Sequence, residues 1–561
     1  MKQVYIYIVV GNVVALVLQF ILFELLARKH RPMKGIPVSI LISAVCYLAI
    51  YVVLQKYFFV IEPSDFLYYF VGPSYSLFFL FSMRMFKTGD TNLSGKVQTQ
   101  TKNESFVRKP DSVVFKTDNG EITINNPFTH FLVLAGTRSG KTKSIGLNLL
   151  KYYLTNHFCG FIYDAKMFDY TRHAYYFKVL EKIGVPIYHL GFSDHGKTYR
   201  TNMIKPKVVG NYTFLAEIIH DISVGLMEND AKKDEWFTSG LGIIQGVAVR
   251  MFMDFPHLCT LGHVSLFVST KNEKELEAFI KGRTESQVYA DEFIKSKGSE
   301  RTRGSILSSA AQLLKPLAAN KDVLYVLTGD DFDFDLVGHG GPKIIAVSND
   351  RRNASVLNGL IGSMVNILSK KIEFGNTQRV FFFFDEGTTF RVPDFSEMVS
   401  VLAEYMVSFA FLTQSKSKME EIYKPTVTKS LVANFNNKFL GRTNEPMDAR
   451  DYSSIFGSQE VQRVTKSSGS SSNERQSTYS RGTSISSSDK TVFKSDDFMA
   501  LGQGQFICNF LDANYHSGKF YFEQAAIDDE RLNDVLLEVN SSFGDVAHAN
   551  YQKIMHDIEK L

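Results

Sequence analysis

One short stretch, residues 131–153, limits what this chain can fold into more than any other. It begins with an apolar run at 131–135 (FLVLA), continues with GTRSGKT at 136–142, and then shows apolar residues at helical spacing. A buried strand that leads through a glycine-containing turn into a helix is typical of a phosphate-binding loop, because the turn lets successive backbone N–H groups point inward. The sequence therefore predicts an α/β fold built around a nucleotide site.

Each residue type in this loop has an expected role. Gly136 and Gly140 let the backbone curl around the phosphates. Lys141 is expected to reach the β and γ phosphates, and the Thr142 hydroxyl to bind Mg²⁺. The usual spacing has a glycine where this chain has Ala135. The residues expected to contact the nucleotide are Gly136, Thr137, Arg138, Ser139, Gly140, Lys141, Thr142 and Lys143.

A second apolar strand, residues 380–384 (VFFFF), ends in Asp385 and Glu386. Acidic pairs after a strand are often turn residues, but beside a phosphate-binding loop they favour the second half of an ATPase site, with ATP and Mg²⁺ as cofactors. Asp385 would hold the metal through water, and Glu386 would polarise the attacking water. Gln414, after the strand at 407–412, is expected to sense the γ-phosphate, with a simple strand cap as the alternative.

Further segments complete an α/β arrangement. Runs at 158–163, 343–347 and 437–440 each end in polar residues, so they are expected to join the same parallel sheet. Residues 113–124 alternate apolar and polar around Asp-Asn-Gly, which predicts a β-hairpin. Between 205 and 322 helical spacing replaces strand signals, which predicts a helical insertion.

Three apolar runs at the amino end, residues 4–27, 36–54 and 66–83, are each about long enough for a membrane-spanning helix. The loop at 28–34 is rich in Lys, Arg and His, which places it and everything after residue 84 in the cytoplasm. Three crossings are expected, and two crossings with an interfacial third segment remain the alternative.

Composition excludes some classes of protein. With 45% apolar and 21% charged residues, the chain is neither disordered nor collagen-like. A net charge of +4 is too small to indicate nucleic-acid binding by itself. The cysteines lack the spacing of a metal site, which indicates a reducing compartment and no structural metal; they are Cys46, Cys159, Cys259 and Cys508.

The order of the motifs resembles that of the TraG/TraD-like type IV coupling proteins, P-loop ATPases related to the FtsK/HerA motors. The resemblance runs from about residue 105 to 525 and is carried by GTRSGK at 136–141, YDAK at 163–166, FDE at 384–386 and TQSKS at 413–417. It implies a RecA-like P-loop NTPase domain with an inserted all-α domain and an N-terminal transmembrane helical anchor. It also implies a hexameric ring, multi-pass in the bacterial inner (cytoplasmic) membrane, with its ATPase domain in the cytoplasm.

The same resemblance implies partners and domains. The expected partners are a relaxase or relaxosome, DNA, and the inner-membrane components of a type IV secretion system. The expected domains are a transmembrane anchor at 1–87, a first nucleotide-domain part at 88–204, an all-α domain at 205–322, a second nucleotide-domain part at 323–525 with a serine-rich mobile segment or hairpin tip at 466–489, and a helical tail at 526–561.

One departure from the family concerns the arginine finger. Many relatives carry an arginine between the acidic pair and the sensor glutamine, but residues 402–408 (LAEYMVS) contain none. Arg442 and Arg391 are the candidates to act in a neighbouring subunit's site, where such a residue can contribute about 10³- to 10⁵-fold in rate. Arg442 is therefore counted with Lys141, the acidic pair and Gln414 among the expected catalytic residues.

Three other readings of the function remain open. The first is a chromosome pump of the FtsK/HerA type, the second a scaffold whose nucleotide site only regulates assembly, and the third a coupling ATPase whose cargo is effector protein without DNA. Basic residues in the helical insertion, such as Arg301, are expected to be solvated rather than to bind DNA or cargo. Trp236, the single tryptophan, is expected to be a core anchor rather than a stacking platform for bases.

Overall fold

The computed structural model of the chain describes residues 48, 52, 56, 93–94, 97–227, 234–350, 352–473, 476–535, 539 and 545–561. Two compact units are present. The smaller unit comprises Met1–Lys96 and Glu460–Lys490, and the larger unit comprises Val97–Gln459 and Thr491–Leu561.

The larger unit contains a mixed sheet of ten strands among its described residues. Their order across the sheet is β2 (Thr101–Lys102), β17 (Tyr515–Tyr521), β16 (Gln505–Asn509), β13 (Asn437–Leu440), β5 (Phe131–Leu134), β12 (Val407–Thr413), β11 (Val380–Phe384), β6 (Cys159–Asp164), β10 (Ile344–Ser348) and β7 (Ile187–Gly191). Strands β13 to β7 pair in parallel, and β16, β17 and β2 add an antiparallel edge. The predicted parallel sheet is confirmed, and each strand that the sequence predicted in it lies within one residue of its expected position.

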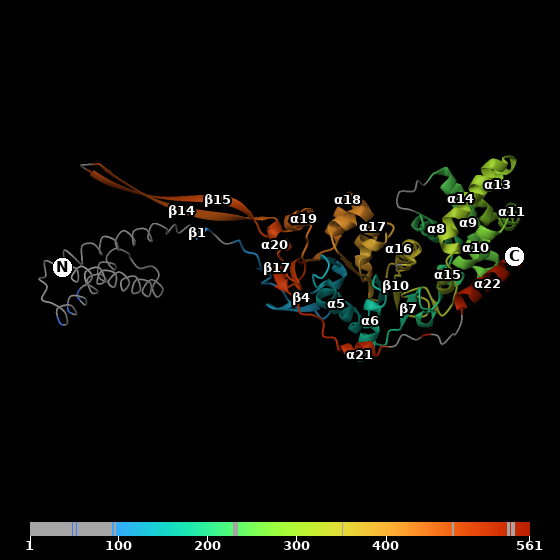
Figure 1. Ribbon diagram of the computed structural model, residues 1–561, viewed down its shortest axis with the longest axis horizontal. Helices are drawn as coiled ribbons and strands as arrows, with labels where there is room; N and C mark the ends of the chain where they lie inside the picture. The colour runs from blue at the N-terminus through green and yellow to red at the C-terminus, as the bar shows by residue number, and fades with distance from the viewer. Residues whose placement is uncertain are drawn as a thin grey trace, which may run out of the picture. The chain divides into compact units, whose positions relative to one another are not determined.

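The parallel strands are apolar throughout because both faces of the sheet are covered. Successive residues of a strand point to opposite faces, so Phe381 and Phe383 join one core and Phe382 and Phe384 the other. Helices α5 (Leu147–Thr155) and α6 (Asp169–Leu180) pack on the first face, and helices α16 (Ala354–Lys370), α17 (Phe395–Leu402) and α18 (Lys416–Asn434) on the second. Figure 1 shows α17 and α18 on the opposite side of the sheet from α6.

The strand register brings the predicted motifs to one edge of the sheet. Phe384 lies opposite Tyr163 in β6 and Phe411 in β12, and Leu134 lies opposite Thr413. Because these strands are parallel, the loops that follow them all leave at the same edge.

A group of helices is inserted between two short strands, β8 (Thr201–Asn202) and β9 (Phe332–Asp333), which pair in parallel. Its described helices are α7 (Pro206–Val209), α8 (Tyr212–Gly225), α9 (Glu235–Asp254), α10 (Leu261–Thr270), α11 (Glu273–Lys281), α12 (Thr284–Tyr289), α13 (Asp291–Lys295), α14 (Glu300–Ala318) and α15 (Lys321–Leu327), with 3-10 turns η5 (Pro256–Leu258) and η6 (Ser296–Gly298). Helix α22 (Val546–Glu559), far away in the sequence, packs against α10 and α15, as Figure 1 shows.

The remaining elements of the larger unit are short. The predicted hairpin at 113–124 is confirmed as the antiparallel pair β3 (Val113–Thr117) and β4 (Gly120–Ile124). The others are α19 (Pro446–Phe456), α20 (Ser495–Met499) and α21 (Asp529–Asn533), the π-helical turn η3 (Lys141–Gly146), and the 3-10 turns η2 (Pro127–Thr129), η4 (His195–Lys197), η7 (Gly387–Thr389) and η8 (Ala403–Tyr405).

The described part of the smaller unit centres on a three-stranded sheet of β1 (Leu93–Ser94), β14 (Ser458–Asn473) and β15 (Gln476–Thr491). The serine-rich residues 466–473 and 476–489, for which the sequence left a mobile segment or a hairpin tip open, lie in β14 and β15. The three apolar runs at the amino end lie outside the described residues, apart from Leu48 and Val52. Among the residues that the structure does describe, no helix combines the length and the apolar character that a membrane crossing needs.

Candidate nucleotide site

The loop between β5 and η3 is held in place by backbone contacts from neighbouring segments. Gly136 N donates to the carbonyl of Arg442 over 2.8 Å, and Gly504 N donates to the carbonyl of Ser139 over 2.8 Å. Gly140 has a φ of +97°, in the left-handed region that favours glycine, and a Cβ placed there would lie 2.7 Å from Gly504 N. The turn and its close contact with the 502–505 loop therefore both require glycine at position 140.

The helix that follows the loop starts as a single π-helical turn, η3, and continues as α5. Such turns are frequent at functional sites. Two hydroxyls beside this helix start, Ser139 Oγ and Ser144 Oγ, are buried and have no hydrogen-bond partner within the described part of the chain. Together with the positive end of the helix dipole, these groups suit an anion such as a phosphate.

Lys141 and Glu386 form an ion pair, although 245 positions separate them in the sequence. Their side chains are only 8% and 15% exposed. Glu386 has a φ of +51°, so its backbone is left-handed at the turn that follows β11. The structure thus brings together the phosphate-binding loop and the acidic pair, whose catalytic roles remain predictions.

Asp385 is fully buried, and neither of its carboxylate oxygens has a hydrogen-bond partner among the residues described. Burial raises the pKa of Asp385 to about 7; Lys166 and Lys141 oppose this increase, whereas Glu386 adds to it. A buried carboxylate with two free oxygens is suited to a divalent cation. The Thr142 hydroxyl lies close by, since Lys166 Nζ is 3.3 Å from Thr142 Oγ1 and 3.8 Å from Asp385 Oδ2. The two predicted metal-binding residues therefore both lie within 4 Å of the Lys166 ammonium group.

The other predicted site residues are Gln414, three exposed residues of the loop and the two candidate finger arginines. Gln414 follows β12 and accepts a hydrogen bond from Lys418 Nζ over 2.8 Å. Its neighbour Thr413 shares a 2.8 Å hydrogen bond with Thr388, two residues after Glu386, so Gln414 starts from the correct edge of the sheet. Thr137, Arg138 and Lys143 are exposed. Both candidate finger residues, Arg391 and Arg442, are exposed, and the backbone carbonyl of Arg442 accepts a hydrogen bond from Gly136 N in the loop.

Comparison with known proteins decides the family. The family model described as type IV secretory system conjugative DNA transfer matches residues 86–543, more than half of the chain. The chain belongs to this family. No curated protein matches it in sequence.

Solved structures of the bacterial conjugative coupling protein TrwB share the fold of this family member. The unbound monoclinic form of TrwBdeltaN70 aligns with a TM-score of 0.55 at 14% identity, covering 76% of this chain and 96% of that chain. The TrwB complex with the ATP analogue ADPNP gives 0.56 at 13%, covering 80% and 98%. The complex with ADP and Mg²⁺ gives 0.52 at 14%, covering 72% and 86%.

In this conjugative DNA transfer chain, sequence reasoning assigned no role to Lys166. The residue follows β6, the strand beside β11, in the motif YDAK. Its position is fixed by Asp164, whose buried carboxylate accepts hydrogen bonds from Lys166 N over 3.1 Å and Thr171 N over 2.9 Å. The signal that could have found Lys166 was its place at the carboxyl end of a strand adjacent to the acidic pair.

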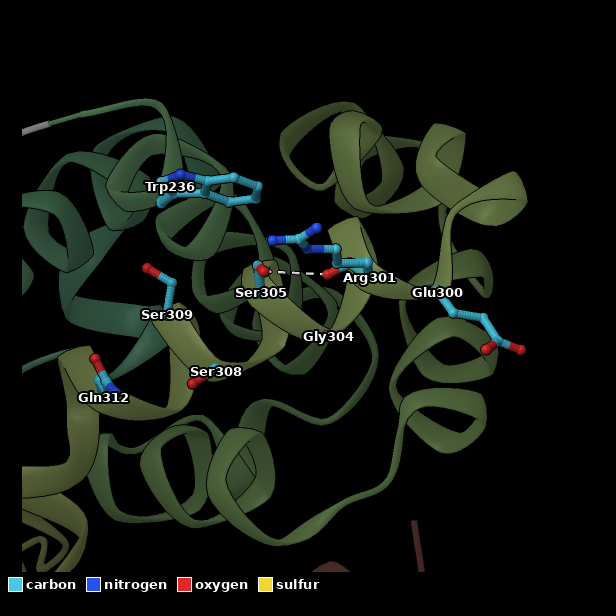
Figure 2. Close-up of a pocket in the computed structure, with 8 residues that line it drawn as sticks. All are labelled: Trp236, Glu300, Arg301, Gly304, Ser305, Ser308, Ser309 and Gln312. Carbon is cyan, nitrogen blue, oxygen red and sulfur yellow. Dashed lines mark hydrogen bonds between the residues drawn. The ribbon is translucent and has the colours of Figure 1, made fainter.

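The expectation for Trp236 was wrong. Its side chain is 45% exposed rather than buried, because it precedes the inward-facing residues of α9, which begin at Phe237. Trp236 lines a pocket of about 490 Å³ between α9 and α14 together with seven further residues, drawn in Figure 2: Glu300, Arg301, Gly304, Ser305, Ser308, Ser309 and Gln312. Most of the residues that line the pocket are polar, and the pocket lies in the helical insertion.

Proposed function

We propose that this chain is a membrane-anchored, hexameric ATPase that couples a relaxase–DNA substrate to a type IV secretion system and drives its transfer by hydrolysing ATP. The observation that carries the proposal is the meeting of Lys141, Glu386, Asp385 and Thr142 at the carboxyl edge of one parallel sheet. Membership of the conjugative DNA transfer family supports the DNA substrate.

ATP and Mg²⁺ are the proposed cofactors, in keeping with the TrwB complexes with ADP and Mg²⁺ and with an ATP analogue. Thr142 and Asp385 would hold the metal, which supplies positive charge against the phosphates when bound. Lys141 has to exchange its present partner, Glu386, for the phosphates. Once released, the Glu386 carboxylate is free to orient and polarise the attacking water, as a P-loop ATPase requires.

The remaining catalytic roles are assigned by position. Gln414 is proposed as the γ-phosphate sensor, because Thr413 links its strand to the turn after Glu386 through the 2.8 Å bond to Thr388. Arg442, or Arg391, is proposed to act in the site of a neighbouring subunit, since both side chains are exposed. Hydrolysis would then take place at subunit interfaces of a ring.

The proposal also includes a location in the cell and a set of partners. The apolar runs within residues 1–87 would anchor the ring in the bacterial inner membrane, beside the inner-membrane components of the secretion system, with the ATPase in the cytoplasm. In the helical insertion, a DNA base could stack on the exposed Trp236 while a phosphate of the same strand forms an ion pair with the neighbouring Arg301.

A mating assay in the native host tests the proposal. A deletion strain is complemented with the wild-type chain, with Glu386→Gln, or with Glu397→Gln, which removes an exposed carboxylate on α17 as a matched control. Plasmid transfer should fall by at least about 100-fold for Glu386→Gln, the usual contribution of a general base, and stay unchanged for the control. Transfer at the wild-type level with Glu386→Gln would overturn the proposal.

Two other outcomes would favour an alternative function. Loss of effector export with intact DNA transfer would assign a protein cargo instead. A defect only in chromosome segregation would favour the FtsK/HerA alternative.

A further inference from the structure

The ammonium group of Lys166 lies among the two groups that suit a metal ion. Its Nζ donates to Thr142 Oγ1 over 3.3 Å and lies 3.8 Å from Asp385 Oδ2. Asp385 is fully buried, and its ion pair with Lys166 compensates its negative charge. Lys141, the other nearby cation, is paired with Glu386.

A second carboxylate shares the same ammonium. Asp169, at the start of α6, places its Oδ2 3.8 Å from Lys166 Nζ, and its side chain is 32% exposed. The Lys166 side chain is itself 48% exposed, so it is not locked in place by packing. Lys166 therefore stands between an inner partner, Asp385, and an outer partner, Asp169, with both distances equal.

We propose that Lys166 is a built-in cation that occupies the metal position in the nucleotide-free protein and moves outward to Asp169 when Mg²⁺ and nucleotide bind. The inference rests on the proposed nucleotide site. Two positive charges cannot share the small space between Thr142 and Asp385 without strong repulsion. An outer partner lowers the cost of the exchange, because the lysine keeps an ion pair after it leaves the inner carboxylate.

The proposal makes Lys166 a competitor of Mg²⁺, and it predicts opposite effects for two substitutions. Lys166→Met removes the competitor and keeps most of the side-chain volume. Asp169→Asn removes the outer partner, so Lys166 is held more firmly on Asp385. A general electrostatic effect on the metal has the same two signs, but its contributions add in the double variant. If Asp169 acts through Lys166, its substitution changes nothing once Lys166 is gone.

The test is a Mg²⁺ titration at constant ADP on the purified full-length chain in detergent, with ADP binding measured by calorimetry rather than by turnover. Lys166→Met should lower the Mg²⁺ concentration at half-saturation by about three- to fivefold, in line with a partly exposed ion pair. Asp169→Asn should raise it by about twofold, and the double variant should equal Lys166→Met. Lys151→Met, on α5 and paired with Glu181, serves as the control for loss of a lysine charge.

The outcomes separate the inference from the proposed function. If the wild-type chain binds no ADP at any Mg²⁺ concentration, the nucleotide site itself is wrong. If it binds ADP but Lys166→Met leaves the Mg²⁺ dependence unchanged, only the exchange is overturned. Additive effects in the double variant would likewise overturn it, because they would mean that Asp169 acts on the metal directly.

Discussion

At the scale of single residues, the site is governed by where charges are buried. Asp385 and Glu386 are consecutive, yet Asp385 is fully buried without a hydrogen bond from any described residue, whereas Glu386 is paired with Lys141. The difference arises from the left-handed turn at Glu386, which directs the second carboxylate towards the phosphate-binding loop. Two adjacent acids can therefore take the separate roles of metal ligand and water-orienting base.

A substitution of Gly140 tests the geometry of the phosphate-binding loop. In Gly140→Ala, a left-handed residue costs about 1–2 kcal/mol, and the new Cβ would also lie 2.7 Å from Gly504 N. We expect both a lower unfolding midpoint and loss of ADP binding. The matched control is Gly341→Ala, where φ is also positive, at +78°, but no atom lies within 4 Å of the new Cβ. An equal effect of both variants on ADP binding would contradict the role of the Gly504 contact.

The buried residue His130 gives a prediction about how stability depends on pH. Its Nδ1 accepts from Phe409 N and its Nε2 lies 2.8 Å from the carbonyl of Val399. Burial lowers the pKa of His130 to about 4, and the Val399 carbonyl only partly opposes this. Since the unfolded chain takes up the proton near pH 6.5, the free energy of unfolding should fall between pH 6.5 and 4, by up to about 3 kcal/mol from this residue.

Urea unfolding of the wild-type chain and of His130→Gln at several pH values measures this effect. The variant should lose less stability on acidification, whatever its stability at pH 7. Replacing the exposed His516 by Gln is the control for the loss of a surface histidine. If His130→Gln and wild type lose the same amount between pH 6.5 and 4.5, the buried neutral histidine is contradicted.

At the scale of elements, the sequence predicts the strands with a clear pattern, either solidly apolar or strictly alternating, and misses others. The parallel strands were found because a short, solidly apolar run such as 380–384 is typical of a strand covered on both faces. The antiparallel strands β16 and β17 were missed; in β17 the residues differ in burial, which gives a mixed pattern along Tyr515–Tyr521. The phosphate-binding loop and acidic pair could be predicted from their motifs. Lys166 was missed although it follows a predicted strand, because the pairing of that strand, β6, with β11 shows only in the structure.

Helix α22 gives a prediction at this scale. Ile554 and Ile558 are buried against α10 and α15, and a Cβ on Gly262 of α10 would lie 3.0 Å from Ile554 Cδ1. Ile554→Ala should weaken docking of α22 by about 2 kcal/mol, which is close to a 30-fold rise in amide hydrogen exchange across 546–559. Lys553→Ala, one residue earlier and exposed, is the control. Unchanged exchange in Ile554→Ala would show that the helix is not held there.

At the scale of the whole molecule, Lys141, Asp385 and Glu386 of the candidate nucleotide site all lie in the larger unit. That unit has continuous cores on both faces of its sheet. The residues that bracket β14 and β15 are already joined, since Val492 N donates to the Gly457 carbonyl over 3.1 Å. Among the described residues, none from Glu460–Lys490 belongs to either core of the sheet.

Replacing Glu460–Lys490 by an Asn-Gly turn should leave the unfolding midpoint and ADP binding of the chain unchanged, because the Gly457–Val492 contact is kept. Differential scanning calorimetry on the full-length chain and the shortened variant provides the measurement. A large drop in the midpoint would mean that the smaller unit supports the fold of the larger one.

The proposed function depends above all on Lys141 and Glu386 serving one ATP-hydrolysing site. ATP binding and phosphate release by the purified full-length chain, in wild type, Lys141→Ala and Glu386→Gln, measure this without reference to any partner. We expect Lys141→Ala to lose binding, and Glu386→Gln to keep binding while releasing phosphate at least about 100-fold more slowly. Wild-type rates of phosphate release in Glu386→Gln would show that this carboxylate does not activate the attacking water, and the proposed site would be wrong.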